Sequence, residues 1–267
     1  MHEFVSLDFR LLSAEKASIP AFSPAFLYGK SVFTTLAVTG GKPFLWEKHW
    51  RRLQSNAAAL NVDLRDFSEE TVSAELARLI EKNGFERGRA RLTVFDRSAA
   101  GLWKRESETA AGLLIATAAG RDFDGPLRLT VSPFPVNSKS PLAGVKSGNY
   151  LENLLALEDA RSKGFDEAVR LNEKGELVST AMANLFWVKA EKIYTPALET
   201  GCLPGTTREF LTENFPVEEI KTGLNELAAA AEIFLTSAGL GIRPAAFGEK
   251  AENLFPTVSK LAKLLDL

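Results

Sequence analysis

Residues 145–184 carry the pattern that most restricts the fold of this chain, because a lysine, a short helix and two strands follow one another closely. Lys146 comes first. A predicted helix follows, with Asn149 placed to cap its start and Gly164 just after its last turn, where glycine is common. The apolar face of this helix consists of Leu151, Leu154 and Leu155.

The helix leads into two predicted strands. The first covers 167–171, the turn Asn172-Glu173-Lys174-Gly175 follows, and the return strand runs into Ser179 and Asn184. Considered alone, Lys146 would be a solvated surface side chain, as most lysines are. Its interpretation therefore depends on the motifs found elsewhere in the chain.

The composition is that of a globular protein able to bury a sizeable core. The chain has 267 residues, of which 45% are hydrophobic and 25% are charged. A net charge of -2 provides no broad field for gripping nucleic acid or an anionic membrane. No apolar run approaches the ~20 residues that cross a bilayer, and the start MHEFVSLDFR lacks the apolar core of a signal peptide.

Cysteine and histidine are scarce. Cys202 is the only cysteine, which excludes an internal disulfide and a cysteine-rich metal site and fits a reducing compartment. Only two histidines are present, His2 and His49, which argues against a multi-histidine metal centre. We therefore expect a cytoplasmic protein without a metal, and without nucleic acid or membrane as a partner.

Apolar periodicity and turn residues divide the chain into two predicted domains. Predicted helices cover 47–60, 68–83, a segment opened by 201–208 and continuing to 215, 224–230 and 256–265. Predicted strands cover the second half of 27–38, then 89–95, 112–118, 127–132, 167–171 and 232–237. A change in composition at 119–126 predicts a linker between a domain of residues 1–118 and a larger one of residues 127–267.

Several spaced motifs together resemble one enzyme family. From Lys146 the chain reads K-x-x-N-Y-L-x-N-x-L-A, and G-x-D-E-A-x-x-L, G-x-x-V and A-N-L-F-W follow from Gly164, Gly175 and Ala183. This order resembles the class IV aminotransferases, which are pyridoxal phosphate (PLP) enzymes. The family includes branched-chain and D-amino acid aminotransferases and the 4-amino-4-deoxychorismate lyases. The resemblance extends from about residue 27 to residue 244.

The resemblance implies roles for Lys146 and Arg52. Lys146 occupies the position of the lysine that binds PLP covalently and then serves as the acid and base of the reaction. The motif H-x-x-R-L covers His49–Leu53, and it implies that Arg52 holds the cofactor phosphate. The rigid fork of donors on arginine suits phosphate oxygens.

Further cofactor contacts are implied in the second half of the chain. Gly201–Arg208 matches the motif G-x-L-x-G-x-T-R, and a glycine-bearing turn that opens a helix offers backbone N–H groups to an anion. The resemblance thus implies phosphate contacts from Thr206 and Thr207, and more at the corner formed by Ser237 and Ala238. It also places Asn184 at the cofactor.

The segment Y-G-K-S-V-F-T-T at 28–35 departs from the family's usual Y-G-D-G-x-F-E-T or F-G-D-G-x-F-T-T. Lys30 stands where aspartate is common, and Ala37 stands where arginine is common. The pair Thr34-Thr35 is nearer the deoxychorismate lyases than the aminotransferases, in which glutamate is usual. Substrate contacts are expected from Tyr28, Lys30 and Thr35.

Ser179 replaces the glutamate that pairs with the pyridine nitrogen of the cofactor in the family. Glu176 lies three residues away, so on a regular strand it points to the other face. A carboxylate stabilises a charged pyridinium, whereas a hydroxyl can hydrogen-bond to a neutral nitrogen. A neutral ring is a weaker electron sink, and this favours elimination over transamination.

The resemblance implies an α+β fold with a small N-terminal α/β domain and a larger C-terminal domain that has a barrel-like sheet. It implies a homodimer that acts on a small amino substrate. The favoured function is that of a 4-amino-4-deoxychorismate lyase, which releases pyruvate and p-aminobenzoate for folate synthesis. One alternative is a branched-chain or D-amino acid aminotransferase. The other is a non-catalytic PLP-binding homologue, which Lys30, Ala37 and Ser179 would permit.

Overall fold

A computed structural model describes residues 1–98, 100–101, 104–105, 110–120, 125–248 and 255–265. The chain divides into two compact units. The first unit comprises Met1–Arg121 and Val145–Asn149, and the second comprises Asp122–Gly144 and Tyr150–Leu267. Residues 121–124 of the predicted linker lie outside the described residues, and the predicted domain limits stay a prediction.

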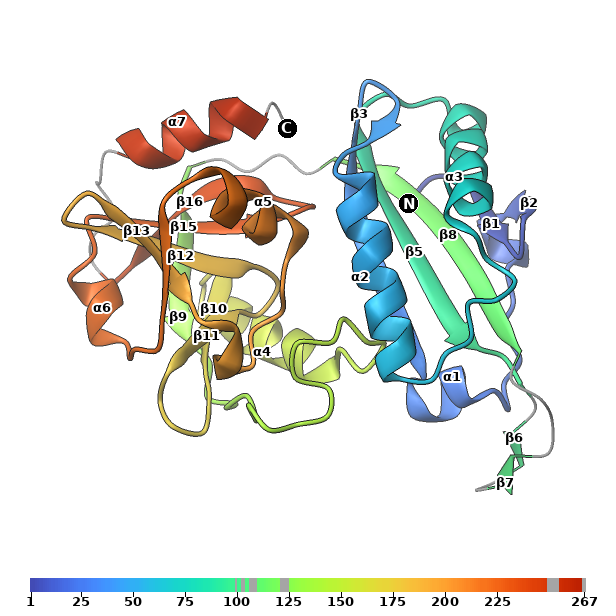
Figure 1. Cartoon of the computed structure of the whole chain (residues 1–267), viewed down its shortest axis with the longest axis horizontal. Helices are drawn as coiled ribbons and strands as arrows, with labels where there is room; N and C mark the ends of the chain where they lie inside the picture. The colour runs from blue at the N-terminus through green and yellow to red at the C-terminus, as the bar shows by residue number, and fades with distance from the viewer. Residues whose placement is uncertain (99, 102–103, 106–109, 121–124, 249–254, 266–267) are drawn as a thin grey trace. The chain divides into compact units, whose positions relative to one another are not determined.

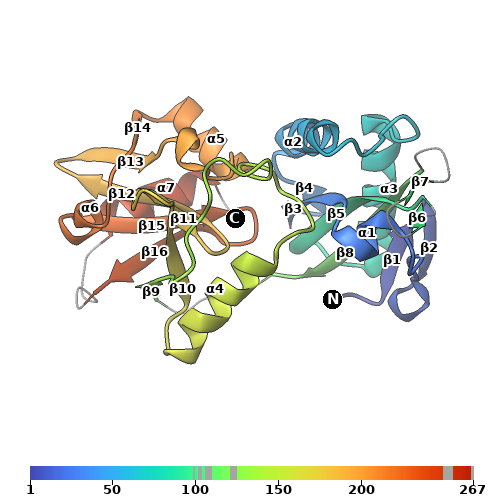
Figure 2. The ribbon, with the colours of Figure 1, turned by 90° about the horizontal axis from the view of Figure 1, so that it is seen from below.

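The first unit is built on an antiparallel sheet with helices on one face. The strands lie in the order β2 (Arg10–Ser13), β1 (Phe4–Leu7), β8 (Ala111–Ala119), β5 (Gly88–Asp96), β3 (Ser31–Thr39) and β4 (Lys42–Pro43). The other elements of this unit are η1 (Ala14–Lys16), α1 (Pro24–Tyr28), α2 (Trp46–Ala59), α3 (Glu69–Asn83) and the short pair β6 (Ala100–Gly101) and β7 (Lys104–Arg105). Figures 1 and 2 show α2 and α3 along the same face of this sheet.

Strand alternation and helix caps explain this packing. Along β3, Val32, Leu36 and Val38 belong to the core beneath the helices, because every second side chain of a strand points to the same face. The helix α3 begins at a capping box in which Ser68 and Thr71 each bond the other's backbone N–H. The predicted helices 47–60 and 68–83 thus agree with α2 and α3 to within a residue at each end.

The segment around Lys146 pairs with a free stretch of the edge of β3. Because β4 pairs only with Val38 and Thr39, the start of β3 remains open on that side. There, Phe33 N–H donates to Lys146 O at 2.9 Å, and Gly148 N–H donates to Ser31 O at 2.7 Å. A Cβ added at Gly148 would overlap Ser31 Oγ, so glycine allows this close pairing without a shift of the serine side chain.

The second unit contains a mixed sheet that curls. Its strands lie in the order β11 (Leu177–Thr180), β10 (Glu167–Leu171), β9 (Leu127–Val131), β16 (Gly241–Phe247), β15 (Glu232–Ser237), β12 (Asn184–Lys189), β13 (Lys192–Pro196) and β14 (Val217–Ile220). Although β11 and β14 are the two ends of this order, Leu177 N–H of β11 donates to Thr222 O just beyond β14, at 2.7 Å. The sheet is therefore barrel-like, as predicted.

Helices flank this sheet: α4 (Leu151–Ser162), η2 (Leu198–Thr200), α5 (Thr206–Asn214), α6 (Asn225–Ala228) and α7 (Pro256–Leu265). Glu232 fixes the start of α7, where its carboxylate accepts the N–H groups of Thr257 and Val258 at 3.1 and 3.0 Å. Val258 and Leu261 of α7 are buried. In the described ranges, no helix is both long enough and apolar enough to span a bilayer.

One expectation for α4 was wrong. Asn149 does not cap the helix, because Tyr150 is the N-cap residue and Asn149 Nδ2 donates to Gly29 O at 3.1 Å in the first unit. The predicted apolar face points to solvent. Its exposed leucines are Leu151, Leu154 and Leu155. Small side chains, Ala156 and Ala160, face the core instead, which allows α4 to approach Ala168 of β10.

Candidate functional site

In the first unit, the Thr34 hydroxyl connects two residues of the H-x-x-R-L motif, His49 and Arg52 of α2. Thr34 Oγ1 lies 2.6 Å from His49 Nδ1 and accepts a hydrogen bond from Arg52 Nη2 at 2.9 Å. All three side chains are buried. Thr34 points to the helix-covered face of the sheet because it alternates with Phe33 and Thr35 on β3.

His49 is neutral in this setting. Burial lowers its pKa well below the usual value, and the positive charges of Arg52 and Lys146 lower it further. Since Thr34 Oγ1 already accepts from Arg52, its own O–H is available to donate to His49 Nδ1. The Thr34 hydroxyl thus fixes both the imidazole and the guanidinium relative to β3.

The amine of Lys146 has an altered proton affinity. Its Nζ lies 4.5 Å from the centroid of the Phe33 ring, and the Arg91 guanidinium lies 3.5 Å from the same centroid. Desolvation lowers the pKa of Lys146 to about 7, with further lowering by Arg52 and Arg91. A substantial fraction of Lys146 is therefore a neutral, nucleophilic amine near pH 7, and the potential around it favours anionic ligands.

The predicted substrate residues occupy different places in the first unit. Lys30 Nζ forms an ion pair with the buried carboxylate of Asp96 at 2.9 Å. Burial alone would raise the pKa of Asp96, but hydrogen bonds from Ser98 and Lys30 lower it. Tyr28 is 43% exposed at the end of α1, and Thr35 lies opposite Arg91 across the β3–β5 pair. The ion pair thus commits Lys30 to holding the end of β5.

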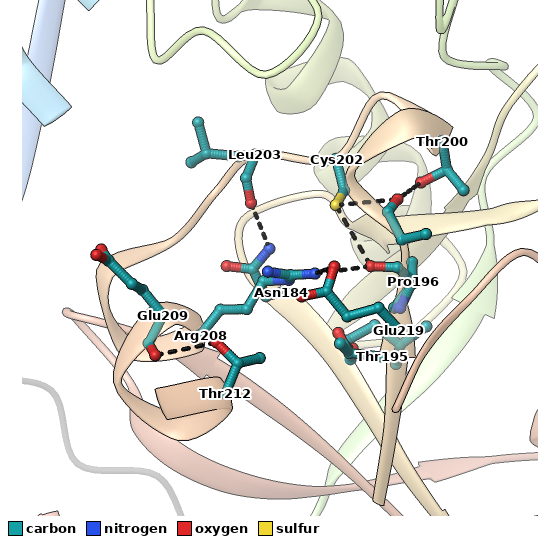
Figure 3. A network of polar contacts seen from close by, with 12 residues as sticks. Asn184, Thr195, Pro196, Thr200, Cys202, Leu203, Arg208, Glu209, Thr212 and Glu219 are labelled. Carbon is teal, nitrogen blue, oxygen red and sulfur yellow. Dashed lines mark hydrogen bonds and ion pairs between the residues drawn. The ribbon is translucent and has the colours of Figure 1, made fainter. Parts of the chain in front are cut away.

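In the second unit, Asn184 lies against the turn that opens α5. Its Nδ2 donates to Leu203 O at 2.8 Å, as Figure 3 shows. A Cβ added at Gly205, the N-cap residue of α5, would overlap Asn184 Oδ1. The predicted phosphate residues, Thr206 and Thr207, are the first two of this helix and are buried. Their position at a helix start suits an anion.

Arg208 ties the first turn of α5 to the neighbouring strands. Its Nη2 donates to Pro196 O at 3.1 Å and to the carboxylate of Glu219 at 2.6 Å (Figure 3). The side chain is 3% exposed. Cys202 is buried in the same region, with its Sγ 3.7 Å from the carbonyl oxygens of Pro196 and Ala197. Burial raises the pKa of the Cys202 thiol.

The end of β15 contains two polar side chains, one of which is hydrogen-bonded and one of which is not, within the described part of the chain. Ser237 Oγ accepts the N–H of Leu240 at 3.2 Å and so closes the turn to β16. Thr236 is fully buried and lies directly opposite Asn184 across the β12–β15 pair. Its hydroxyl has no hydrogen-bond partner among the described residues, which is costly for a buried polar group unless a ligand or water satisfies it.

Ser179 lies on β11, opposite Arg170 of β10. Its hydroxyl donates to Thr180 O at 2.8 Å. The hydroxyl proton is therefore directed to the backbone, while its oxygen lone pairs remain able to accept. The carboxylate of Glu176 accepts from Asn172 Nδ2 at 2.7 Å, so it serves the turn between the two strands.

The sequence reasoning missed Glu167, a buried carboxylate at the start of β10. It accepts the N–H groups of Met182 and Ala168, both at 3.3 Å. Burial raises the pKa of Glu167 to about 7, although these hydrogen bonds oppose the rise. Glu167 thereby holds the turn that joins β11 to β12, between Ser179 and Asn184. The sequence feature that could have indicated Glu167 is an acidic residue at the start of a largely apolar predicted strand.

The structure brings the predicted residues together in two groups. Lys146 and Arg52 gather in the first unit, where Arg52 and Lys146 are close enough for their charges to interact. In the second unit, Asn184 contacts the turn that leads to Thr206 and Thr207. Residues 237–238 lie on the neighbouring strand end. Their roles as cofactor contacts stay predictions.

Comparison with known proteins gives consistent matches. The family model described as "Amino-transferase class IV" matches residues 31–246. The aminodeoxychorismate lyase of Bacillus subtilis (strain 168) is 28% identical over 257 residues, covering 88% of this chain and 83% of the relative.

Solved structures extend this likeness to the fold. The 4-amino-4-deoxychorismate lyase of Pseudomonas aeruginosa has a TM-score of 0.85 and 25% identity, covering 98% of this chain and 97% of that one. The branched-chain aminotransferase of Thermoproteus uzoniensis has a TM-score of 0.92 and 26% identity, covering 100% and 94%. These likenesses confirm the predicted two-part α+β fold class.

Proposed function

We propose that this chain, which belongs to the amino-transferase class IV family, is a 4-amino-4-deoxychorismate lyase. Membership of the family confirms the predicted resemblance, the predicted enzyme class and the predicted cofactor, pyridoxal phosphate. The lyase activity itself is our proposal. It is supported by the relative from Bacillus subtilis, which bears that name and matches most of this chain.

The side chains present suit pyridoxal phosphate. Lys146 provides an amine whose pKa is lowered to about 7 and which can therefore bond covalently to an aldehyde. In the second unit, the helix start at Gly205 suits an anion, and the buried hydroxyl of Thr236 has no hydrogen-bond partner among the described residues. When bound, the cofactor supplies an electron sink for the bonds of the substrate's amine-bearing carbon.

The residues of the chain would bind, orient and move protons. Arg52 would hold the phosphate through its guanidinium, which Thr34 keeps in place. In the second unit, the backbone N–H groups of Thr206 and Thr207 stand at a helix start, which suits a phosphate. Once substrate displaces it, Lys146 Nζ would accept and return a proton, for which a pKa near the working pH is favourable.

Thr34 is the single observation that carries the choice of a lyase. In the family resemblance, aminotransferases usually have glutamate at this position, and its carboxylate would place a negative charge beside Arg52. Thr34 provides only a hydroxyl there. The positive potential of Arg52 and Arg91 therefore acts on the surroundings of Lys146, which favours an anionic substrate such as 4-amino-4-deoxychorismate.

A second candidate is a branched-chain aminotransferase, favoured by the TM-score of 0.92 to the enzyme from Thermoproteus uzoniensis. One experiment separates the two. Purified protein with added PLP is given 4-amino-4-deoxychorismate, and p-aminobenzoate and pyruvate are measured; in parallel it is given branched-chain or D-amino acids with 2-oxoglutarate. We expect equal amounts of p-aminobenzoate and pyruvate. Rapid transamination without p-aminobenzoate would assign the aminotransferase function instead.

We also propose that the enzyme is a cytoplasmic homodimer. Support for a dimer comes from α4, whose Leu151, Leu154 and Leu155 are 66%, 44% and 43% exposed on one helical face. Apolar side chains clustered in this way favour a protein interface. Light scattering should give twice the mass of 29.1 kDa, and Leu154→Glu should shift the protein toward the monomer.

A further inference from the structure

The side chain of Asn184 is held between two points of the turn that precedes α5. Its Nδ2 donates to Leu203 O at 2.8 Å (Figure 3), and its Oδ1 occupies the space that a Cβ at Gly205 would need. Asn184 is 7% exposed. Both ends of one amide group thus meet the backbone of residues 203–205.

Gly205 is required by this packing and not by its backbone angles. Its φ of -70° and ψ of 144° are open to any residue. The glycine is needed because Asn184 Oδ1 lies where a side chain would begin. The asparagine and the glycine therefore form one steric unit, in which each determines what the other can be.

Arg208 fixes the far side of the same turn. Its guanidinium bonds Pro196 O and Glu219, so the first turn of α5 is tied to β13 and β14. Asn184, at the start of β12, ties the preceding turn to the adjacent strand. The path of the backbone at the helix start is thereby set from two directions.

We propose that Asn184 is a positioning residue that sets the turn 203–205, so that the N–H groups of Thr206 and Thr207 converge on the cofactor phosphate. This inference rests on the proposed function as a PLP enzyme. It assigns to Asn184 an effect on the cofactor that passes through the turn, because its amide donor is committed to Leu203 O. A loss at Asn184 should therefore weaken recognition of the phosphate and leave recognition of the pyridine ring intact.

The test compares two ligands of the apoprotein, PLP and pyridoxal, which lacks the phosphate. Asn184→Asp keeps the shape of the side chain but places an oxygen against Leu203 O. We expect its affinity for PLP to fall at least tenfold and its affinity for pyridoxal to stay within twofold. Asn214→Asp is the matched control, because Asn214 Nδ2 also donates to a backbone carbonyl, Phe210 O at 2.8 Å, at the other end of α5. The control should bind both ligands as the wild type does.

A double-mutant cycle tests the steric unit. Gly205→Ala should weaken PLP binding in the wild type, where the new methyl group meets Asn184. In Asn184→Ala protein the obstructing side chain is gone, so Gly205→Ala should reduce the affinity for PLP much less. Equal costs in the two backgrounds would overturn the proposal, because they would show that Gly205 and Asn184 act independently.

Other outcomes are equally decisive. If folded Asn184→Asp protein loses PLP and pyridoxal affinity in parallel, or loses neither, Asn184 does not position the phosphate turn. Should Asn184→Asp not fold, the cycle with Gly205→Ala and Asn184→Ala still decides. Wild-type protein that fails to bind PLP would instead refute the proposed function, so the two failures are distinguishable.

Discussion

The two groups of site residues are built from different chemistry. In the first unit, Lys146 and Arg52 interact through charge, and burial together with neighbouring cations lowers the pKa of both Lys146 and His49. In the second unit, Asn184 and Gly205 act through shape and neutral hydrogen bonds. Ligand binding and stability at the first group should therefore change with pH and salt. At the second group, they should change when a substitution alters the size of a side chain.

The charged group also has a cost for folding. The pKa of Lys146 is lowered, so the unfolded chain binds a proton that the folded chain has released between about pH 7 and the ordinary range of lysine. The stability of the protein without cofactor should rise with pH over that interval. No corresponding dependence is expected from the turn of Asn184 and Gly205, because neither residue titrates.

The largest expected effect comes from Lys146. Borohydride reduction of the wild-type protein saturated with PLP should label Lys146, and Lys146→Met should lose the covalent cofactor and all turnover. The same variant should be more stable than the wild type near pH 7 without cofactor, since it removes an amine whose charged form is disfavoured by desolvation in the folded protein. Label on another lysine, or an unchanged pH dependence of unfolding, would contradict the charged half of the comparison.

The next effect concerns Arg52. Arg52→Ala should weaken PLP binding by about 1.5–3 kcal/mol, the range for hydrogen bonds to charged groups. The neighbouring exposed residue supplies the control, Arg51→Ala on the same helix. The binding of PLP to wild type should weaken with salt more steeply than that of Arg52→Ala. Equal salt dependence and unchanged affinity in a folded variant would return Arg52 to a structural role.

The sequence predicted the positions of the motifs better than their contacts. Lys146 and Arg52 follow from spacing, because covalent and phosphate chemistry require particular residue types at particular intervals. The ion pair of Lys30 with Asp96 joins residues far apart in the chain, so no local pattern revealed it. The fit of Asn184 against Gly205 depends on how two strands and a turn meet, and Gly205 alone looks like an ordinary turn residue.

Sequence patterns also failed to predict the structure where packing and strand pairing determine it. The predicted face of α4 followed its leucines, yet Ala156 and Ala160 pack inward because β10 approaches closely there. The strands β13, β14 and β16 were not predicted. They are short or contain proline and charged residues, as in KIYTP, VEEI and GIRPAAF. Pairing with neighbours in the curled sheet, rather than intrinsic preference, makes them strands.

Ser179→Glu would break the comparison by bringing a charge into the second unit. The carboxylate should raise the pKa of the pyridine nitrogen of bound PLP, whereas the native hydroxyl donates to Thr180 O. We expect a several-fold faster conversion of bound PLP to pyridoxamine phosphate with a simple amino acid, followed by absorbance. Ser179→Ala is the control and should show no gain. A Ser179→Glu protein that binds PLP normally without a gain would refute the electronic argument.

The smallest expected effect concerns Glu167, the buried carboxyl that gives the second unit a pH response of its own. Its pKa is raised to about 7, so the folded protein retains a proton that the unfolded chain loses above its ordinary value of 4.5. The contribution to stability is therefore present below about pH 4.5 and is lost as pH rises through about 7. Since one pKa unit corresponds to about 1.4 kcal/mol, Glu167→Gln should reduce the decline in unfolding free energy from pH 6 to pH 7 by about 1 kcal/mol. Chemical denaturation at the two pH values measures this, with the exposed Glu218→Gln as control. An unaltered decline would show that the Ala168 and Met182 N–H groups keep Glu167 charged, and the second unit would then be as insensitive to pH as its neutral turn.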